Sequence, residues 1–265
     1  MNVLRLELKT GFKPFVFWVI GLFSLVFAGV IKFTGIGGPG GTSINELFDK
    51  FPRIILALFG MSGLDATTIE GYYGILFFYV LICGMIYGMS LGTNVVNREI
   101  VDKTVEFLFT KPRKRTAIVN MKFLSAVLYL MAFSLLNYLF SLVAVRTLEL
   151  EKKIDTEILL FSFVLFIISL LYCVIGLFIA TIVKEAEKGS LYGNLFFLAT
   201  FILSIFYDVV ENGRIIRLFT PFKYFLPTDL VAGQLEVLPL LALIVIIVSV
   251  YLISLRLFEK KEWMN

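Results

Sequence analysis

The chain has 265 residues, of which 59% are hydrophobic and only 17% are charged, compared with about 25% in ordinary soluble domains. The net charge of +4 does not indicate nucleic-acid binding, because the charges lie between apolar runs instead of on one face, and the absence of histidine removes the commonest metal ligand and general base. Apolar runs long enough to cross the roughly 30 Å hydrocarbon core of a bilayer recur throughout, so the composition predicts a polytopic all-α membrane protein.

The N-terminal stretch 1–14, MNVLRLELKTGFKP, alternates leucine with charged side chains, as in an amphipathic helix that lies on a membrane surface. The first apolar run, 15–31, follows it. This run is longer than a signal-peptide core of roughly 7–15 residues, and no A-x-A cleavage pattern comes after it. We therefore expect an N-terminal surface helix followed by a retained first span.

Six apolar runs predict six transmembrane helices in a single transmembrane domain that covers 1–265. The expected spans are about 15–31, 71–93, 123–145, 158–183, 190–207 and 238–258. An even number of spans places both termini on one side of the membrane. With the termini inside, the inner segments hold 15 of the 24 Lys and Arg residues, so the positive-inside rule predicts that both termini are cytoplasmic.

The two long outer loops, 32–70 and 208–237, are expected to be more than linkers. The first contains a GIGGPGG turn at 35–41 and an apolar stretch at 54–61. The second contains RLFTPFKYFLPTDL at 217–230, with four aromatic residues and two prolines. Two interpretations stay open, a short interfacial helix or re-entrant cap in each loop, and a loop that only anchors at the interface.

Glycines recur every fourth residue in the second span, at Gly84, Gly88 and Gly92. This row lies on one helical face and allows the backbone of another helix to approach closely, either within the subunit or across a dimer. The two cysteines, Cys83 and Cys173, both fall inside apolar runs. We interpret them as packing residues and not as a disulfide or a metal pair.

Between the second and third spans lies a charged island, 94–122, with seven Lys and Arg residues. When residues 96–108 are placed on a helix at about 100° per residue, the apolar and the charged side chains occupy opposite halves. Only Asn97 and Thr104 are polar residues on the apolar side. The apolar half holds Val96, Ile100, Val101, Val105, Phe107 and Leu108, and the charged half holds Arg98, Glu99, Asp102, Lys103 and Glu106. The island therefore contains a predicted amphipathic helix, which ends before Lys111-Pro112.

A sequence pattern within this island, E-x-x-x-x-T-x-E-x-L-x-x-x-P-x-x-R, resembles that of the ABC-2 type permease family. It is formed by Glu99, Thr104, Glu106, Leu108, Pro112 and Arg115. Lys103 stands where the family usually has glycine. The aromatic stretch Thr220–Phe225 is also similar to the segment that precedes the last span in this family. With the surface helix and the six spans, the resemblance covers essentially the whole chain.

The resemblance implies an ABC-2, type V exporter-like architecture, in which the island supplies a cytoplasmic coupling helix. That helix would seat in a separate ABC ATPase subunit through Arg98, Glu99, Asp102, Lys103, Thr104, Glu106, Pro112 and Arg115. ATP and Mg would bind in that partner, and this chain would hold no cofactor, no metal and no catalytic residue. The further expected partners are membrane lipids and a second permease subunit, like or unlike, in a bacterial plasma membrane.

Enzymes and ion-coupled transporters fit the sequence less well than this interpretation. An ATPase would need the P-loop pattern G-x-x-x-x-G-K-[ST], which the sequence lacks, and Tyr207-Asp208 has no G-x-G-D partner motif of an aspartyl protease. An ion-coupled transporter would place ionisable residues in its spans, where this chain has only Arg256 near an inner end. A non-ABC channel and a membrane scaffold stay open as alternatives.

The polar residues inside the spans are few, and they suggest the class of cargo. The candidates to line a pathway are Ser90, Ser134, Asn137, Tyr138 and Asn194. Such a pathway favours an amphipathic or hydrophobic cargo, either a peptide of the cytolytic or antimicrobial kind or a drug. A lipid-linked glycan or an ion is the alternative cargo.

Overall fold

The computed structural model describes residues 3–36, 50–101, 115–149, 152–183, 185–210 and 214–260. Over these ranges the chain forms helices and no strand, which confirms the all-α class. The long helices are α1 (Val3–Ile36), α4 (Ile69–Val101), α6 (Arg115–Arg146), α7 (Asp155–Ile182), α8 (Ala186–Val209) and α11 (Val237–Lys260). The short ones are α3 (Arg53–Leu58), α9 (Arg214–Leu218), η1 (Pro221–Lys223) and α10 (Pro227–Val231).

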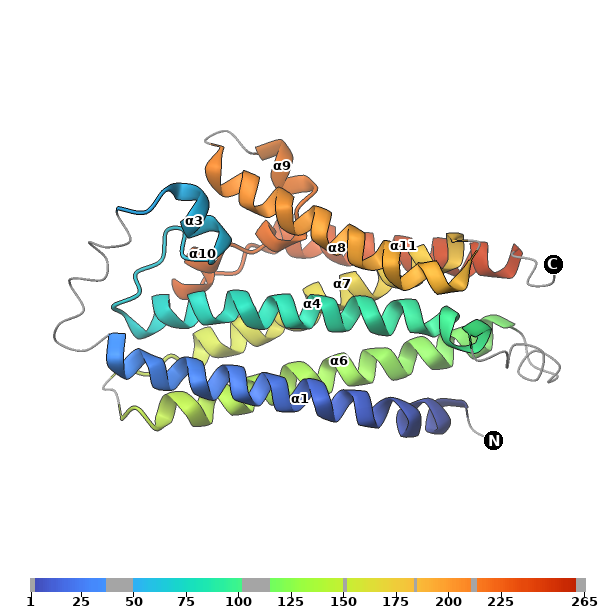
Figure 1. The fold of residues 1–265 in the computed structure, drawn as a ribbon, viewed down its shortest axis with the longest axis horizontal. Coiled ribbons are helices and arrows are strands. Elements are labelled where there is room, and N and C mark those ends of the chain that lie inside the picture. The colour runs from blue at the N-terminus through green and yellow to red at the C-terminus, as the bar shows by residue number, and fades with distance from the viewer. Residues whose placement is uncertain are drawn as a thin grey trace.

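The six long helices are each long and apolar enough to cross a membrane, and they pack around a central pair. Helices α4 and α7 lie in the middle, with α1 and α6 on one side of them and α8 and α11 on the other (Figure 1). In their most apolar stretches, 67% of the residues of α4 and of α7 are buried, against 17% in α1 and in α11. The outer helices therefore leave apolar faces for lipid or for another protein.

The glycine row of α4 is the reason that the central pair packs so closely. A Cβ atom added at Gly88 would lie 2.2 Å from the carbonyl oxygen of Ser169, and one at Gly92 would lie 1.9 Å from that of Cys173. At Gly84 the added atom would meet the side chain of Ser169 at 2.6 Å. Only glycine lets the two backbones approach this closely, so the row packs against α7 within the subunit.

Helix α1 is continuous from Val3 to Ile36, so the expected division into a surface helix and a first span is not seen. Pro14 lies inside this helix. The hydroxyl group of Tyr129 on α6 donates a hydrogen bond to the carbonyl of Leu8, which joins the first turns of α1 to α6. The N-terminal residues are therefore part of the bundle.

The bundle has two different ends. At the terminal end, α1 begins, α11 finishes, α4 stops at Val101 and α6 starts at Arg115 (Figure 1). At the cap end lie the short helices α3, α9, η1 and α10, where α3 and η1 contact α8 and α10 contacts α4. The described parts of the two loops predicted to lie outside thus contain short helices that pack on the bundle.

Candidate functional site

The predicted coupling segment connects α4 to α6 at the terminal end. Arg98 and Glu99 belong to the last turns of α4, and Arg115 is the first residue of α6. The other predicted coupling residues lie outside the described residues; they are Asp102, Lys103, Thr104, Glu106 and Pro112. The structure therefore describes where the segment leaves one helix and enters the next.

Helix α4 continues through residues 94–101 instead of ending near residue 93, and the beginning of the predicted amphipathic segment is buried. Val95 and Val96 pack in a small apolar cluster with residues from three other helices. Those residues are Val119 of α6, Leu177 and Ala180 of α7, and Phe258 of α11. A movement of the α4–α6 connection would therefore act directly on α7 and α11.

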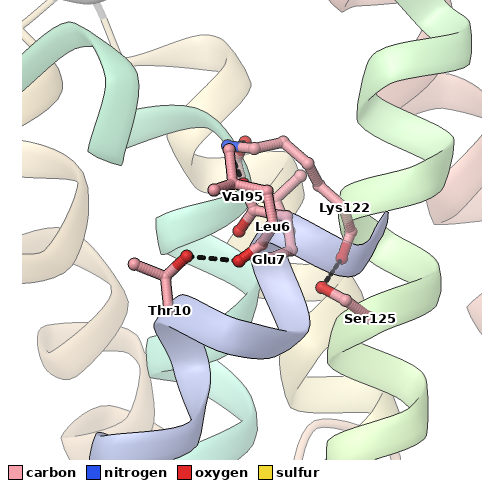
Figure 2. A network of polar contacts seen from close by, with 6 residues as sticks. All are labelled: Leu6, Glu7, Thr10, Val95, Lys122 and Ser125. Atoms are coloured by element: carbon pink, nitrogen blue, oxygen red, sulfur yellow. Dashed lines mark hydrogen bonds and ion pairs between the residues drawn. The ribbon is translucent and has the colours of Figure 1, made fainter. Parts of the chain in front are cut away.

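A buried lysine joins three helices at this end (Figure 2). The side chain of Lys122 on α6 is only 3% exposed, and its ammonium group donates a hydrogen bond of 3.1 Å to the carbonyl of Val95 on α4. The same group lies 3.7 Å from a carboxylate oxygen of Glu7 on α1. Because a buried ammonium is stable only when it is paired, Lys122 ties α6 to both neighbours.

Two further hydrogen bonds lie near Lys122, one within α6 and one between α6 and α11. The hydroxyl of Ser125 donates to the carbonyl of Lys122 at 2.7 Å, within α6 (Figure 2). The hydroxyl of Tyr251 on α11 donates to the side-chain oxygen of Asn120 at 2.9 Å. Polar contacts at the terminal end therefore reach α1, α4, α6 and α11.

A cavity of about 370 Å³ lies beside Lys122, between α1, α4 and α6. Glu7, Ser90 and Asn94 contribute polar groups to its wall, and Trp18 and Tyr87 contribute aromatic rings. The ring centroids of Trp18 and Tyr87 are 5.3 Å apart. The hydroxyl group of Tyr87 is buried and has no hydrogen-bond partner among the described residues. The cavity thus combines charged, amide and hydroxyl groups with an aromatic wall.

Two of the predicted pathway residues join helices and are fully packed. Ser134 and Asn137 are buried where α6 meets α7, and both contact Ser162 of α7. The hydroxyl of Ser134 donates to the carbonyl of Ser162, and the amide of Asn137 donates to its hydroxyl at 2.9 Å. Tyr138 is half-buried and Asn194 is exposed on α8, whereas Ser90 lines the cavity beside Lys122.

Asn97, the polar residue on the apolar side of the helical projection, is buried against α8. An added Cβ at Gly189 of α8 would lie 2.2 Å from its amide nitrogen. Among the residues that the structure describes, neither the amide nitrogen nor the amide oxygen of Asn97 has a hydrogen-bond partner.

At the cap end, the polar groups pair at short distances. The ammonium of Lys223 in η1 lies 2.6 Å from a carboxylate oxygen of Asp208 in α8, and the two side chains are 10% and 9% exposed. Arg217 donates hydrogen bonds to the carbonyls of Lys223 at 2.9 Å and Tyr224 at 3.1 Å, and pairs with Glu236 at 2.9 Å. Asp208 therefore has a structural role.

The cap end also contains packed aromatic rings and a partly buried tyrosine, Tyr224. The ring of Phe222 packs 5.5 Å from that of Phe201 and 6.1 Å from that of Phe197. The hydroxyl of Tyr224 donates to the carbonyl of Leu218 at 2.6 Å, and burial raises the pKa of Tyr224 above its usual value. These contacts fix the segment that precedes α11.

The residues that organise the terminal end were not predicted as site residues. Lys122 was predicted only to contribute to the positive charge of the island, and Glu7 only to belong to a surface helix. One signal was available, because Lys122, Ser125 and Tyr129 are spaced i, i+3 and i+7 and therefore share one face of a helix. This face carries polar groups at the start of an apolar span.

The fold and this site define a polytopic helical membrane protein with a basic connection at one end and a compact cap at the other. A family model described as ABC-2 family transporter protein matches residues 1–263. The chain belongs to this family, whose members are membrane permeases of ABC transporters and associate with an ABC ATPase subunit. No curated protein matches the sequence.

Proposed function

We propose that the chain is the permease subunit of an ABC exporter in a bacterial plasma membrane, with both termini and the terminal end facing the cytoplasm. A separate ATPase subunit binds ATP and Mg and docks on the segment between α4 and α6. The charge distribution supports this orientation, since seven Lys and Arg residues lie between Asn94 and Lys122.

The buried contact between Lys122 and Val95 is the observation that carries the proposal. It joins the two helices close to both ends of the α4–α6 connection, and Glu7 brings α1 into the same contact. A displacement of the connection by an ATPase would therefore reach three helices through Lys122. The apolar cluster around Val96 would pass the same displacement to α7 and α11.

The cargo we propose is amphipathic or hydrophobic, a peptide of the cytolytic or antimicrobial kind or a drug. The middle stretches of the six long helices contain no Asp, Glu, Lys or Arg. Polar groups such as Asn137 and Ser162 contact each other inside the subunit. The apolar faces of α1, α8 and α11 leave room for a second permease subunit, so that the pathway would form between the two.

Charge reversal tests whether the segment between α4 and α6 couples this chain to its ATPase. The chain is co-purified with its ATPase, and the variants Glu99→Lys and Glu106→Lys are compared with Glu149→Lys, an exposed position after α6. We expect the first two to lose ATPase stimulation and export of a fluorescent amphipathic peptide from membrane vesicles, with the folded subunit retained. Glu149→Lys should behave like the wild type. Unchanged export in Glu99→Lys and Glu106→Lys would contradict the coupling role.

A further inference from the structure

The cavity between α1, α4 and α6 lies at the depth of lipid headgroups. Lys122 and Asn94 are each next to the end of an apolar stretch, and the carboxylate of Glu7 lies 3.7 Å from the ammonium of Lys122. The polar zone on each side of the hydrocarbon core is about 5–8 Å thick. The charged part of the cavity therefore lies in this zone, and Trp18 and Tyr87 lie closer to the hydrocarbon core.

The charges of the cavity suit a ligand that carries both signs. The ammonium of Lys122 and the carboxylate of Glu7 are 3.7 Å apart, which is too long for a hydrogen bond. A phosphate oxygen placed in the cavity could approach the ammonium at about 2.7–2.9 Å, the usual length of a charge-assisted hydrogen bond. A primary ammonium could donate to Glu7 in the same way. Two opposite charges in the wall thus match two opposite charges in the ligand.

The deeper wall offers a further contact. The hydroxyl of Tyr87 is buried and has no hydrogen-bond partner in the described part of the chain, and Tyr87 is among the residues that line the cavity. Its position nearer to the apolar stretch would allow it to donate to an ester carbonyl, which lies deeper in a lipid than the phosphate. Such a bond would satisfy a group that otherwise lowers stability.

We propose that this cavity binds the headgroup of a phosphatidylethanolamine-type lipid from the adjacent leaflet. Lys122 binds the phosphate, Glu7 binds the primary ammonium, and Tyr87 contacts the glycerol ester region. The proposal assigns a lipid site that is independent of the exported cargo and of the ATPase.

Tryptophan fluorescence tests the site, because the chain has only two tryptophans, Trp18 in the cavity wall and Trp263 near the C-terminus. In the full-length Trp263→Phe variant, purified and delipidated in detergent, the emission comes from Trp18 alone. Phosphatidylethanolamine with brominated acyl chains is titrated and the quenching midpoint is measured. Brominated phosphatidylcholine and phosphatidylglycerol are titrated separately. We expect the lowest midpoint for phosphatidylethanolamine, by about tenfold.

Three substitutions, each added to the Trp263→Phe variant, test the roles of Lys122, Glu7 and Tyr87. Lys122→Gln should raise the midpoint for every phospholipid by about tenfold, because the phosphate contact is lost. Glu7→Gln should remove the preference for phosphatidylethanolamine over phosphatidylcholine. Tyr87→Phe should raise the midpoint by about threefold. Size-exclusion chromatography checks the folding of each variant.

Matched controls and a soluble competitor decide the outcome. Lys9→Gln, on the exposed side of α1, and Tyr192→Phe, exposed on α8, should bind like the parent variant. Equal midpoints for the three lipids, or unchanged curves in both Glu7→Gln and Tyr87→Phe, would overturn the proposal. If glycerophosphoethanolamine without acyl chains competes at the same concentration as the lipid, the ligand is a free phosphoamine and the lipid assignment is wrong. No ATPase is present in this assay, so its failure would leave the proposed function untouched.

Discussion

At the cap end, Lys223 and Asp208 meet at 2.6 Å, whereas at the terminal end Lys122 and Glu7 are 3.7 Å apart beside a cavity of about 370 Å³. The first pair joins two elements that are 15 residues apart in the sequence, and the second joins two distant helices beside a cavity. A short, enclosed ion pair allows little relative movement of its elements, and a longer pair beside a cavity allows more. The ion pair at the terminal end, near the segment on which we propose that the ATPase docks, thus has a cavity beside it.

A substitution in the glycine row, which packs α4 closely against α7, should give the largest loss of stability. Gly92→Leu places a side chain where a Cβ would already lie 1.9 Å from the carbonyl of Cys173, so we expect a loss of about 3 kcal/mol or more in stability. Gly21→Leu is the control, because an added Cβ at Gly21 has no atom within 4 Å. Thermal unfolding in detergent measures both. A stable Gly92→Leu protein would contradict the close approach of α4 and α7.

The enclosed pair at the cap end should give the second largest effect. Lys223→Met leaves the carboxylate of Asp208 in a largely enclosed position without its partner, and we expect a loss of about 3 kcal/mol. Lys153→Met, at an exposed position, should have no comparable effect. Adding Asp208→Asn to Lys223→Met should recover part of the loss. If the double variant is no more stable than Lys223→Met, the two charges are not coupled.

Loss of the ion pair between Lys122 and Glu7 at the terminal end should cost less stability. In Lys122→Met the carboxylate of Glu7 stays close to the cavity, where water can solvate it, and we expect a loss of about 1–2 kcal/mol in the same unfolding assay. The prediction is that Lys122→Met unfolds at a higher temperature than Lys223→Met. The reverse order would remove the difference between the two ends.

The smallest effects should come from one tyrosine at each end. Tyr224→Phe and Tyr251→Phe each remove one hydrogen bond, so each should cost about 1 kcal/mol or less.

Burial raises the pKa of Tyr224, so above pH 10 the unfolded chain loses this proton before the folded one does. The wild type should therefore lose part of its advantage over Tyr224→Phe as the pH rises above 10. A constant difference in melting temperature up to pH 11 would contradict this.

The long helices could be predicted because the bilayer fixes the length of an apolar run, and six runs of that length are present. The contact between Tyr129 and Leu8, which joins α6 to the first turns of α1, could not be predicted, because the two residues are far apart in the sequence. Likewise, the charge of Lys122 predicted an aqueous side, whereas its burial depends on where α4 places the carbonyl of Val95. Local patterns predicted helices, and contacts between helices determined the site.

The packing of α4 on α7 has a mechanical consequence. A helix of 33 residues is about 50 Å long, and α4 extends from the cap end to the terminal end with its backbone against that of α7 at Gly88 and Gly92. Two helices joined backbone to backbone bend less easily than two that touch only through flexible side chains. The pair therefore acts as a stiff lever: a small tilt imposed at Val101 would displace the opposite end, where the cap lies, without first being absorbed in the middle of the membrane.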